Sequence, residues 1–417
     1  MPYDSRLDYR PAVVVLNMHY TGLGIARALR GTADVWGLSF DDTFIGNRSR
    51  HCRFVRYPDP ASQPEAALAF FRDFAARFER PPLLLPTRDL DIEFLLLHRT
   101  EIESRYRLAL APTPVLERVL DKSRLAAAAR EIGIACPVEV LVKGPADLAR
   151  ARDEIRLPCI VKPPVTSRWR HAAILAALRG RKVVTFDRWD ELTTFYHDIA
   201  RFDAEVLVQE YIPGADEDLA IFGSYRSSDG GLIRYFTARK LLQAPPGSGT
   251  GIVVQAIRVP QIVDSSKALL EKLGLTGISE IEYKRDPRDG RYVLIEINTR
   301  HWDQHMLGAA AGVNLTRALY DDLVGAPVAA MEQDARSVAW IAEEGYVVGL
   351  LDAVRGTSYP LRQYVAPLFG RKTWATLAWD DPRPSLQLAR RVLAEYARAA
   401  RAAARHIGGS AKERQAD

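Results

Sequence analysis

The sequence predicts a mixed α/β protein, with a doubly wound sheet near its start and a polar β-hairpin much farther along the chain. Residues 11–16 form a short apolar run, and a loop with two glycines leads to a helix-like segment at 25–30 and a second apolar run at 35–40. This order of strand, glycine turn, helix and strand is typical of a doubly wound sheet. Residues 281–300 contain two apolar segments around a turn rich in Asp, Pro and Gly, which indicates a hairpin.

Four polar side chains of this hairpin are expected on one face. Glu296, Asn298 and Arg300 are two residues apart in the second strand and therefore project from the same side. Glu282, in the first strand, can reach that side. Two carboxylates and a carboxamide oxygen suit Mg²⁺, and an arginine suits an anion beside the metal. Taken alone, the pattern fits an edge hairpin with a solvated polar face equally well.

The Glu282 and Glu296-x-Asn298-x-Arg300 pattern resembles the metal-binding strands of the ATP-grasp superfamily. Three more segments resemble parts of the same fold in the expected order: Asp121-Lys122-Ser123, the strand at 157–163 and the hinge strand at 206–214. Arg239-Lys240, which we expect to end a strand before a mobile Pro- and Gly-rich loop, resembles a stretch of the D-aspartate ligase-like branch. The resemblance covers about residues 10–325.

The resemblance implies an ATP-grasp fold preceded by a Rossmann-like domain at residues 1–115. The ATP-grasp domain is expected at 116–325, with a lid subdomain at about 150–208. Residues 326–417 are expected to form a C-terminal extension without a usable motif. Within it, residues from about 386 to 406 alternate Ala, Arg and Leu, which predicts an amphipathic helical tail.

Two lysines are expected at the ATP phosphates. Lys162 lies in an apolar strand, where an unpaired buried ammonium group is costly. Lys122 lies in the first turn of a helix that Asp121 can cap, where a positive charge opposes the helix dipole. A bound phosphate would account for both positions.

The rest of the nucleotide site follows from the resemblance. The main chain of Glu210, Tyr211 and Ile212 is expected to bind adenine. Asp218 is expected to bind the ribose hydroxyls, with Asp216 and Glu217 as alternatives. The loop at 163–171 lacks the glycines common in this fold, so its side chains from Ser167 to His171 are expected to contact the nucleotide or its lid in place of a backbone cradle.

The implied function is an ATP- and Mg²⁺-dependent ligase that joins an amino-acid-type carboxylate to an amine through an acylphosphate and releases ADP and phosphate. Arg300 and Lys240 are the expected catalytic residues, and Glu282, Glu296 and Asn298 the metal ligands. Two Mg²⁺ ions are expected, with Mn²⁺ as an alternative. A kinase for a small hydroxyl substrate on the same fold and a non-catalytic nucleotide-binding regulator are the rival hypotheses.

Other polar residues carry weaker signals. His301 and His305 have the spacing of a helical metal pair, but no third ligand is visible, so an acceptor-site or structural role is preferred. Residues at the ends of the first and third apolar runs are candidate substrate neighbours, against the alternative of loop capping: His19, Tyr20, Thr87, Arg88 and Asp89.

Composition narrows the class of protein. The net charge is +5, but no basic-aromatic motif is present, so no nucleic-acid partner is expected. There is no apolar run long enough for a membrane span and no secretory leader pattern. Three cysteines form no CxxC pair, which favours a reducing, cytoplasmic setting. The oligomeric state stays open, with a homodimer as one alternative.

Overall fold

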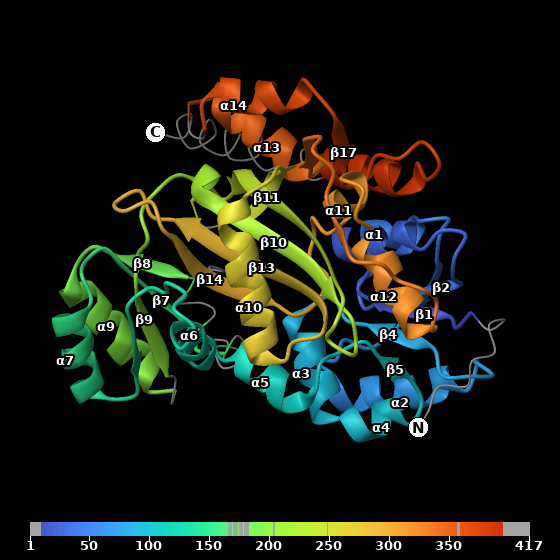
Figure 1. Cartoon of the computed structure of the whole chain (residues 1–417), viewed down its shortest axis with the longest axis horizontal. Helices are drawn as coiled ribbons and strands as arrows, with labels where there is room; N and C mark the ends of the chain where they lie inside the picture. Colours follow the sequence, from blue (N-terminus) through green and yellow to red (C-terminus); the bar gives the residue numbers. More distant parts are fainter. Residues whose placement is uncertain are drawn as a thin grey trace, which may run out of the picture.

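The computed structural model describes residues 10–394 except 166–168, 170–173, 175–177, 179–182, 203–204, 248 and 357–358. In this described part of the chain, three β-sheets organise the molecule (Figure 1). An N-terminal sheet and a small lid sheet lie on different sides of a large central sheet. None of the helices in these residues is both long and apolar enough to span a membrane.

The N-terminal sheet is parallel and has the strand order β3-β2-β1-β4-β5. Its strands are β1 (Val13–Leu16), β2 (Val35–Ser39), β3 (Arg53–Arg56), β4 (Leu83–Leu85) and β5 (Arg107–Leu108). All four residues of β1 are fully buried, as expected for a parallel strand covered on both faces. Val13 and Val15 pack on the side of α1, and Val14 and Leu16 pack on the side of α2 and α3. This is the doubly wound sheet that the sequence predicts.

The helices of this region are α1 (Tyr20–Ala28), α2 (Pro64–Ala75), α3 (Asp89–Leu97) and α4 (Arg99–Glu103). The prediction that Gly22 and Gly24 form a loop was wrong, because both lie inside α1. A Cβ atom on Gly22 would lie 2.4 Å from the carbonyl oxygen of Asn17, and one on Gly24 would lie 2.6 Å from Cε1 of His305. The glycines therefore allow α1 to pack closely between the end of β1 and the segment that follows the hairpin.

The lid is an antiparallel sheet of order β6-β9-β7-β8. The helices α5 (Thr113–Leu120) and α6 (Lys122–Arg130) precede it. The lid comprises β6 (Glu139–Val142), α7 (Pro145–Glu154), β7 (Cys159–Lys162), β8 (Val184–Phe186), α9 (Trp189–Ala200) and β9 (Val206–Glu210). Its apolar core is separate from those of the other sheets. In Figure 1 the lid projects to one side, joined to the rest by α6 and the chain after β9.

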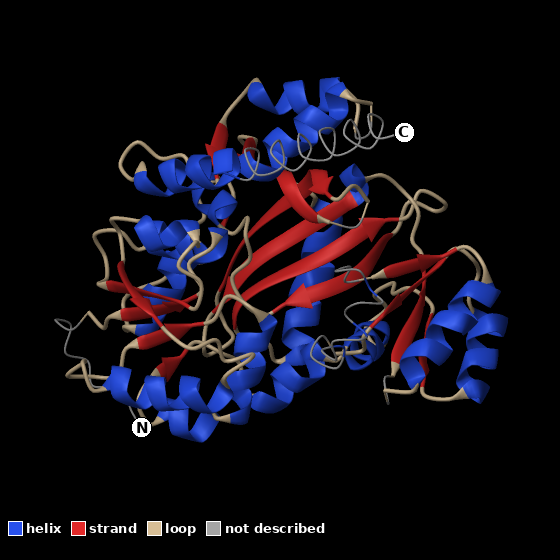
Figure 2. Cartoon of the chain, turned by 180° about the vertical axis from the view of Figure 1, so that it is seen from behind, coloured by secondary structure: helices blue, strands red, loops and turns tan. Residues whose placement is uncertain are grey.

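The central sheet is largely antiparallel and runs β14-β13-β10-β11-β12-β16-β17, with β15 paired to β11. Its strands are β10 (Leu219–Arg226), β11 (Ile233–Ala244), β12 (Thr250–Ala256), β13 (Gly277–Arg285), β14 (Tyr292–Asn298), β15 (Met331–Glu332), β16 (Val338–Ile341) and β17 (Lys372–Trp374). Helix α10 (Val263–Leu273) packs on one face through a continuous apolar core. It lies in front of the sheet in Figure 1, and Figure 2 shows the sheet from the opposite side. The hairpin expected at 281–300 is present as β13 and β14, and β14 is an edge strand.

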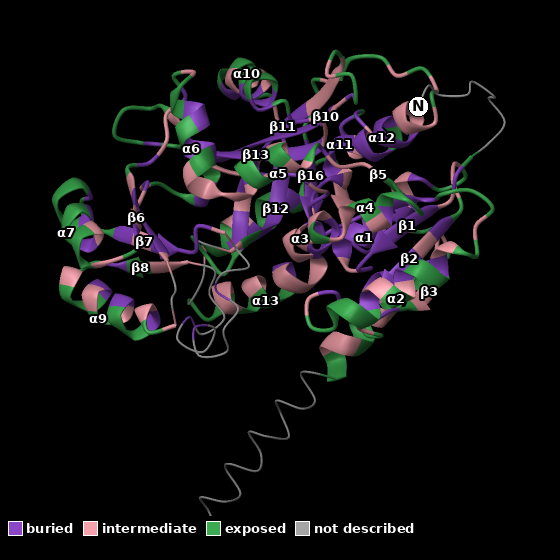
Figure 3. Cartoon of the chain, turned by 90° about the horizontal axis from the view of Figure 1, so that it is seen from below, coloured by how far each residue is buried: buried purple, intermediate pink, exposed green. Residues whose placement is uncertain are grey.

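The chain after the hairpin contacts both the N-terminal domain and the central sheet. Helices α11 (Met306–Ala310) and α12 (Leu315–Leu323) pack beside α1, and strands β15, β16 and β17 join the central sheet. Helices α13 (Glu343–Val354) and α14 (Leu361–Val365) follow β16, and a last described helix spans residues 383–394. That helix begins before the predicted tail at 386, and residues 395–406 of the predicted tail lie outside the described part. Figure 3 shows that the strands of all three sheets are mostly buried.

One buried carboxylate fastens the C-terminal region to the N-terminal sheet. Asp381 has no exposed side-chain surface and accepts hydrogen bonds from Arg27 Nε at 3.1 Å, Ser49 Oγ at 2.8 Å and the backbone N–H of Arg50 at 3.0 Å. Arg27 also donates to the carbonyl oxygens of Ala375 and Thr376. Losing this carboxylate would leave a buried guanidinium and a buried N–H without their acceptor.

Asp381→Ala is therefore expected to lower the free energy of unfolding by about 3 kcal/mol or more, as for other broken buried ion pairs. The neighbouring Asp380, which is 45% exposed and paired with an exposed Arg30, serves as a matched control. Asp380→Ala should change stability by less than about 1 kcal/mol. Urea denaturation of the two variants measures the difference, and equal effects would contradict the role given to Asp381.

Candidate active site

The hairpin brings its carboxylates together in register. Glu282 lies opposite Glu296, and Glu280 lies opposite Asn298, on the face of the central sheet away from α10. Asn298 Nδ2 donates to Glu280 Oε2 at 2.9 Å and lies 3.4 Å from Glu296 Oε1. These contacts fix the orientation of the amide, so that Asn298 Oδ1 points away from Glu280.

Glu280 is a member of this cluster that the sequence analysis missed. Its side chain is 2% exposed, and its Oε1 has no hydrogen-bond partner among the described residues. Burial, followed by the nearby charge of Glu282, raises the pKa of Glu280 well above its usual range. The signal was available, because Glu280 and Glu282 have the same period-two spacing that singled out Glu296 and Asn298.

The prediction that Arg239 and Lys240 end a strand was wrong. β11 continues to Ala244, because residues 242–244 still pair with β12 across a β-bulge. Lys240 is buried mid-strand, and its Nζ donates to both carboxylate oxygens of Glu282, at 2.7 and 2.8 Å. Burial disfavours its charge, but the carboxylates of Glu282 and Glu280 outweigh burial and raise the pKa of Lys240. Arg239 Nη2 instead donates to the hydroxyl of Tyr292 at 3.1 Å.

Arg300 joins the hairpin to the N-terminal domain. Its Nε donates to Asp89 Oδ1 at 2.7 Å, and its Nη2 donates to Asp89 Oδ2 and to Asn298 Oδ1, each at 3.2 Å. Asp89 is the first residue of α3 and was one of five candidate substrate neighbours in the N-terminal region. Of the other four, Thr87 donates to the carbonyl oxygen of Leu16 and Arg88 pairs with Asp59 and Asp91. The ring of His19 contacts that of Phe44, and the hydroxyl of Tyr20 donates to Glu344 of α13 at 3.2 Å.

Lys122 and Lys162 approach the same place from two further elements. Asp121 caps α6 through the N–H groups of Ser123 and Arg124, as predicted, and so fixes Lys122 in the first turn. Burial lowers the pKa of Lys122, although Glu296 and Asp89 oppose this effect. Burial, followed by the charge of Lys122, lowers the pKa of Lys162 to about 8. Two partly desolvated ammonium groups therefore lie near one carboxylate, which favours a polyanion between them.

Lys162 is positioned by a short chain of hydrogen bonds across the lid. Its Nζ donates to Gln209 Oε1 at 2.9 Å, and Gln209 Nε2 donates to Glu139 Oε2 at 2.8 Å. These residues come from three adjacent strands, β7, β9 and β6. Gln209 and Glu139 were not expected from the sequence, because only the strand pairing brings them beside Lys162.

A narrow pocket of about 40 Å³ lies where α3, α6, β14 and the loop after β7 meet. Its lining includes Asp89 from α3, Lys122 from α6, Val165 from the loop after β7, and Glu296 and Asn298 from β14. This volume is well below the roughly 300 Å³ of a typical small-ligand site.

The hinge residues lie at the end of β9. The backbone N–H of Glu210 donates to the carbonyl oxygen of Val138 at 2.8 Å, and its carboxylate accepts from Arg288 Nη2 at 2.7 Å. Tyr211 is half-buried, with Lys284 Nζ 5.2 Å from its ring centroid, and Ile212 is buried. Burial lowers the pKa of Lys284, a hinge neighbour that the sequence analysis missed.

The three acidic residues after the hinge have different environments. Asp216 is buried and accepts hydrogen bonds from Gln243 Nε2 at 2.7 Å and from the hydroxyl of Tyr359. Asp218 Oδ2 accepts from the N–H of Ala215 at 2.9 Å and stays half-buried, and Glu217 is exposed. Since Asp216 has internal partners, Asp218 remains the preferred ribose residue.

Two other sets of candidates include residues with buried side chains. His301 and His305 are buried side by side, bonded to Thr316 and to the carbonyl oxygen of Trp302, and burial lowers the pKa of His305 to about 4. In the loop after Lys162, only Trp169 of the predicted segment Ser167 to His171 is described; Ser167, Arg168, Arg170 and His171 lie outside the described residues. Of the two contacts expected for Trp169, the structure has the one with the lid: its ring is buried in the lid core, and its Nε1 donates to the carbonyl oxygen of Glu205.

The donor set suits a magnesium ion. Among the described residues no three Asp, Glu, His or Cys side chains are arranged to hold a metal, so a closed site made by protein ligands alone is not present there. Glu296, Asn298 Oδ1 and Glu282 instead offer a few hard oxygen donors beside a phosphate-binding region. Mg²⁺ is commonly held by one or two carboxylates together with substrate phosphates and water.

Comparison with known proteins agrees with this geometry. No model of a known protein family matches the chain. D-aspartate ligase from Enterococcus faecium is 25% identical over 252 residues, which cover 58% of this chain and 58% of that protein. Among solved structures, N5-carboxyaminoimidazole synthetase from Staphylococcus aureus aligns with a TM-score of 0.63 at 12% identity over 84% of this chain and 87% of that one. L-amino acid ligase from Bacillus licheniformis aligns with a TM-score of 0.55 at 17% identity over 75% and 74%.

The chain has the ATP-grasp fold. The predicted fold class and the predicted resemblance to the D-aspartate ligase-like branch are confirmed. The domain boundaries and the roles of individual site residues stay predictions. The chain spans 58% of the length of D-aspartate ligase, so the match does not by itself establish an activity or a substrate for this ATP-grasp protein.

The ionisation of Lys162 should make the free energy of unfolding depend on pH. Its pKa is about 8 in the folded protein and 10.5 ordinarily, so between these values the unfolded chain binds more protons and the free energy of unfolding rises with pH. From about pH 8 to about pH 10, the wild type should gain roughly 2 kcal/mol relative to Lys162→Met. Urea denaturation at both pH values measures this gain. Lys143→Met, at an exposed lid lysine, should keep the wild-type pH dependence, and the same behaviour in Lys162→Met would contradict the assignment.

Proposed function

We propose that this ATP-grasp protein is an ATP- and Mg²⁺-dependent ligase that joins a carboxylate to an amine through an acylphosphate. The observation that carries the proposal is the convergence of Lys122, Lys162 and Arg300 on the Glu296 and Asn298 end of the hairpin. Cationic groups from α6, the lid and β14 then surround the position for the phosphates. Hard oxygen donors face the same position.

The two lysines neutralise the phosphate chain of ATP in this proposal. Both are partly or fully desolvated, so their attraction to a phosphate is stronger than that of a surface lysine. Arg300, which Asp89 holds in place, stabilises the charge on the transferring phosphoryl group. Mg²⁺, held by Glu282, Glu296 and Asn298, supplies neutralisation of the phosphate charge when bound; two ions are expected, with Mn²⁺ as an alternative.

The reaction proceeds in two balanced steps. An oxygen of the substrate carboxylate attacks the γ-phosphorus, the bond to the β-phosphate oxygen breaks, and ADP leaves. The nitrogen of the amine then attacks the carbonyl carbon of the acylphosphate, phosphate leaves, and the amine nitrogen loses a proton. Preorganised cations around the phosphoryl group supply most of the stabilisation that such a transfer needs.

Lys240 has a supporting role in this scheme. The sequence analysis expected it to contact the substrate, but its ammonium is directed at Glu282. We therefore assign it to keeping Glu282 ionised and in a fixed orientation. Replacing it would leave a buried, unpaired carboxylate in the cluster.

The nucleotide base and sugar are proposed to lie at the hinge. The N–H of Glu210 is already bonded within the lid sheet, so its carbonyl oxygen and the main chain of Tyr211 and Ile212 are the groups left for adenine. Asp218 is proposed to accept from the ribose hydroxyls. The buried Lys284 and the ring of Tyr211 shape the same end of the site.

The resemblance to D-aspartate ligase and to L-amino acid ligase supports an amino-acid-type acid as substrate. The proposed partners are two small molecules, a carboxylate and an amine, and the proposed location is the cytoplasm. Phosphate release across pairs of amino acids and amines, with ATP and Mg²⁺ present, is the screen that identifies them.

With an active pair in hand, Glu296→Gln should reduce the rate of ADP formation by about a hundredfold or more while leaving the fold intact, because one electrostatic contact in the transition state is lost. Glu271→Gln, at an exposed position of α10 on the other face of the sheet, is the control and should be unaffected. Steady-state kinetics at saturating Mg²⁺ make the measurement. Near-normal turnover by Glu296→Gln would remove this residue from the site.

The reaction class has its own test. With ATP, Mg²⁺ and the correct acid but no natural amine, hydroxylamine should trap the acylphosphate as a hydroxamate, detected by its iron complex or by mass. A kinase would instead form a stable phosphate ester of a hydroxyl compound, without any hydroxamate. Finding that ester, with ADP release that needs no carboxylate, would overturn the ligase proposal and leave the fold assignment intact.

A further inference from the structure

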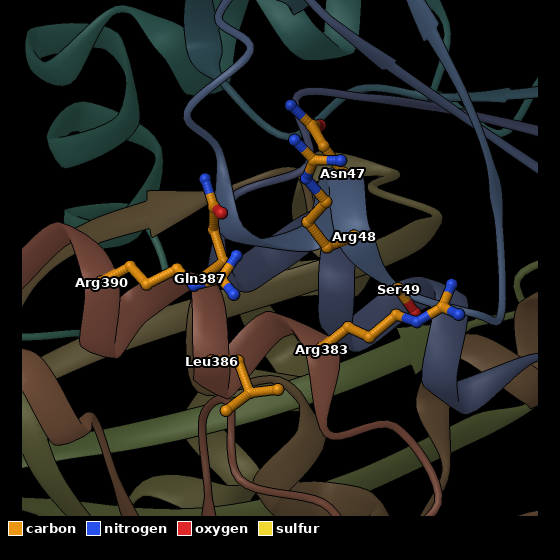
Figure 4. A pocket seen from close by; sticks show the side chains of 7 residues that line it. All are labelled: Asn47, Arg48, Ser49, Arg383, Leu386, Gln387 and Arg390. Atoms are coloured by element: carbon orange, nitrogen blue, oxygen red, sulfur yellow. The ribbon is translucent and has the colours of Figure 1, made fainter.

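A second, larger pocket lies between the N-terminal domain and the helix at residues 383–394 (Figure 4). Its volume is about 460 Å³, within the range of small-molecule sites. It shares no residue with the pocket at the hairpin. One wall is formed by residues 47–49, at the end of the 3₁₀ helix η1 (Ile45–Arg48), and the other by residues 383–390.

Both walls present guanidinium groups. Arg383, Gln387 and Arg390 have the spacing of one helix face, and Arg48 lies on the opposite wall. Figure 4 shows these side chains around the same space. No acidic residue lines the pocket, and within the described chain no hydrogen bond or ion pair is formed by the guanidinium groups of Arg48, Arg383 or Arg390.

The nearby carboxylates are already bonded elsewhere. Asp381 binds Arg27 and Ser49, and Asp380 pairs with Arg30. On the other segment, Asp41 accepts from the N–H and the hydroxyl of Thr43, and Asp42 pairs with Arg56. The positive charge of the pocket therefore has no internal counter-charge among these neighbours.

Buried hydrogen bonds shape the pocket without using the arginines. Ser39 Oγ donates to Asn47 Oδ1 at 2.6 Å, and Asn47 Nδ2 donates to the carbonyl oxygen of Asp41 at 2.9 Å. Ser49 is bonded to the buried Asp381, which fastens the start of the 383–394 helix to the same loop. Substitution of the exposed arginines should therefore leave both walls in place.

We propose that this pocket binds a small molecule that carries a phosphate group, separately from the nucleotide site. Guanidinium groups bind phosphate through paired hydrogen bonds, and three of them match a group with more than one negative charge. The loop at 45–49 follows β2, at the carboxyl edge of a doubly wound sheet, where ligands of such sheets bind. Leu386 offers an apolar contact, and Gln387 a neutral hydrogen-bonding group, to the remainder of the ligand.

Pyrophosphate is the probe for this proposal. It is titrated calorimetrically into the full-length protein at physiological salt without Mg²⁺. Wild type, Arg383→Gln/Arg390→Gln and Arg48→Gln are compared, with Arg362→Gln at an exposed position of α14 as the matched control. A Lys122→Met variant is included because the phosphate groups of the probe could also bind at the hairpin. The melting temperature of each variant checks that the fold is retained.

The double variant should bind pyrophosphate about tenfold more weakly or worse, because two charge-assisted contacts are lost. Arg48→Gln removes a guanidinium group from the opposite wall and should also weaken binding. This variant gives an independent result if the double variant does not fold. Arg362→Gln should bind as the wild type does. Lys122→Met removes a phosphate contact at the hairpin and should retain the binding event that the two pocket variants weaken. Equal affinity in the wild type and both pocket variants, or binding lost only in Lys122→Met, would overturn the site. Succinate binding as tightly as pyrophosphate would overturn the phosphate class. The proposed ligase activity is not needed for any of these results.

Discussion

The ion pair between Arg300 and Asp89 connects the two units that make the candidate active site. Arg300 follows strand β14 of the hairpin, and Asp89 lies in the first turn of α3. Arg300 Nε is 2.7 Å from Asp89 Oδ1, and Arg300 Nη2 is 3.2 Å from Asp89 Oδ2. Because Arg300 also donates to Asn298 Oδ1, the pair sets the position of the carboxamide that is expected to face the metal. The N-terminal sheet thus helps to position a site whose main residues are on the central sheet.

Charges of both signs are buried along the same face of the central sheet. The pair formed by Lys240 and Glu282 is internally neutral, whereas Glu280 and Glu296 remain near one another and near Asn298. Across the pocket, Lys122 and Lys162 carry ammonium groups whose pKa values are lowered by burial. Burying separated, incompletely paired charges costs free energy. This arrangement therefore favours binding of groups that complete the pairing.

The C-terminal region is part of the same physical unit although its sequence carries no recognisable motif. Strands β16 and β17 extend the central sheet, and Asp381 and Arg391 bind partners on α1 and α13 respectively. The helix at 383–394 is therefore fixed against the N-terminal domain. This placement forms the arginine-lined pocket, which is separate from the hairpin and uses no residue assigned to ATP.

Sequence patterns were informative wherever a local rule applied. The period-two spacing of Glu296 and Asn298 determined that they share a face, although β14 ends before Arg300, and the N-cap preference of Asp121 determined where α6 begins. The same reasoning failed at Lys240, because the Pro and Gly residues after 244 suggested an earlier end to β11 than its pairing with β12 allows. It also failed at Gly22 and Gly24. Glycine is typical of turns, but here it is needed because α1 packs closely against its neighbours.

The sequence by itself determined the fold class and the chemical types of the site residues, since strand alternation, capping and motif order are local properties of the chain. Only the tertiary structure decided which charges meet. Asp89 reaches Arg300 from more than 200 residues away, Gln209 reaches Lys162 through strand pairing, and Arg48 faces Arg383 across a domain contact. Such contacts depend on how separate elements pack together, and no local pattern of side chains encodes that packing.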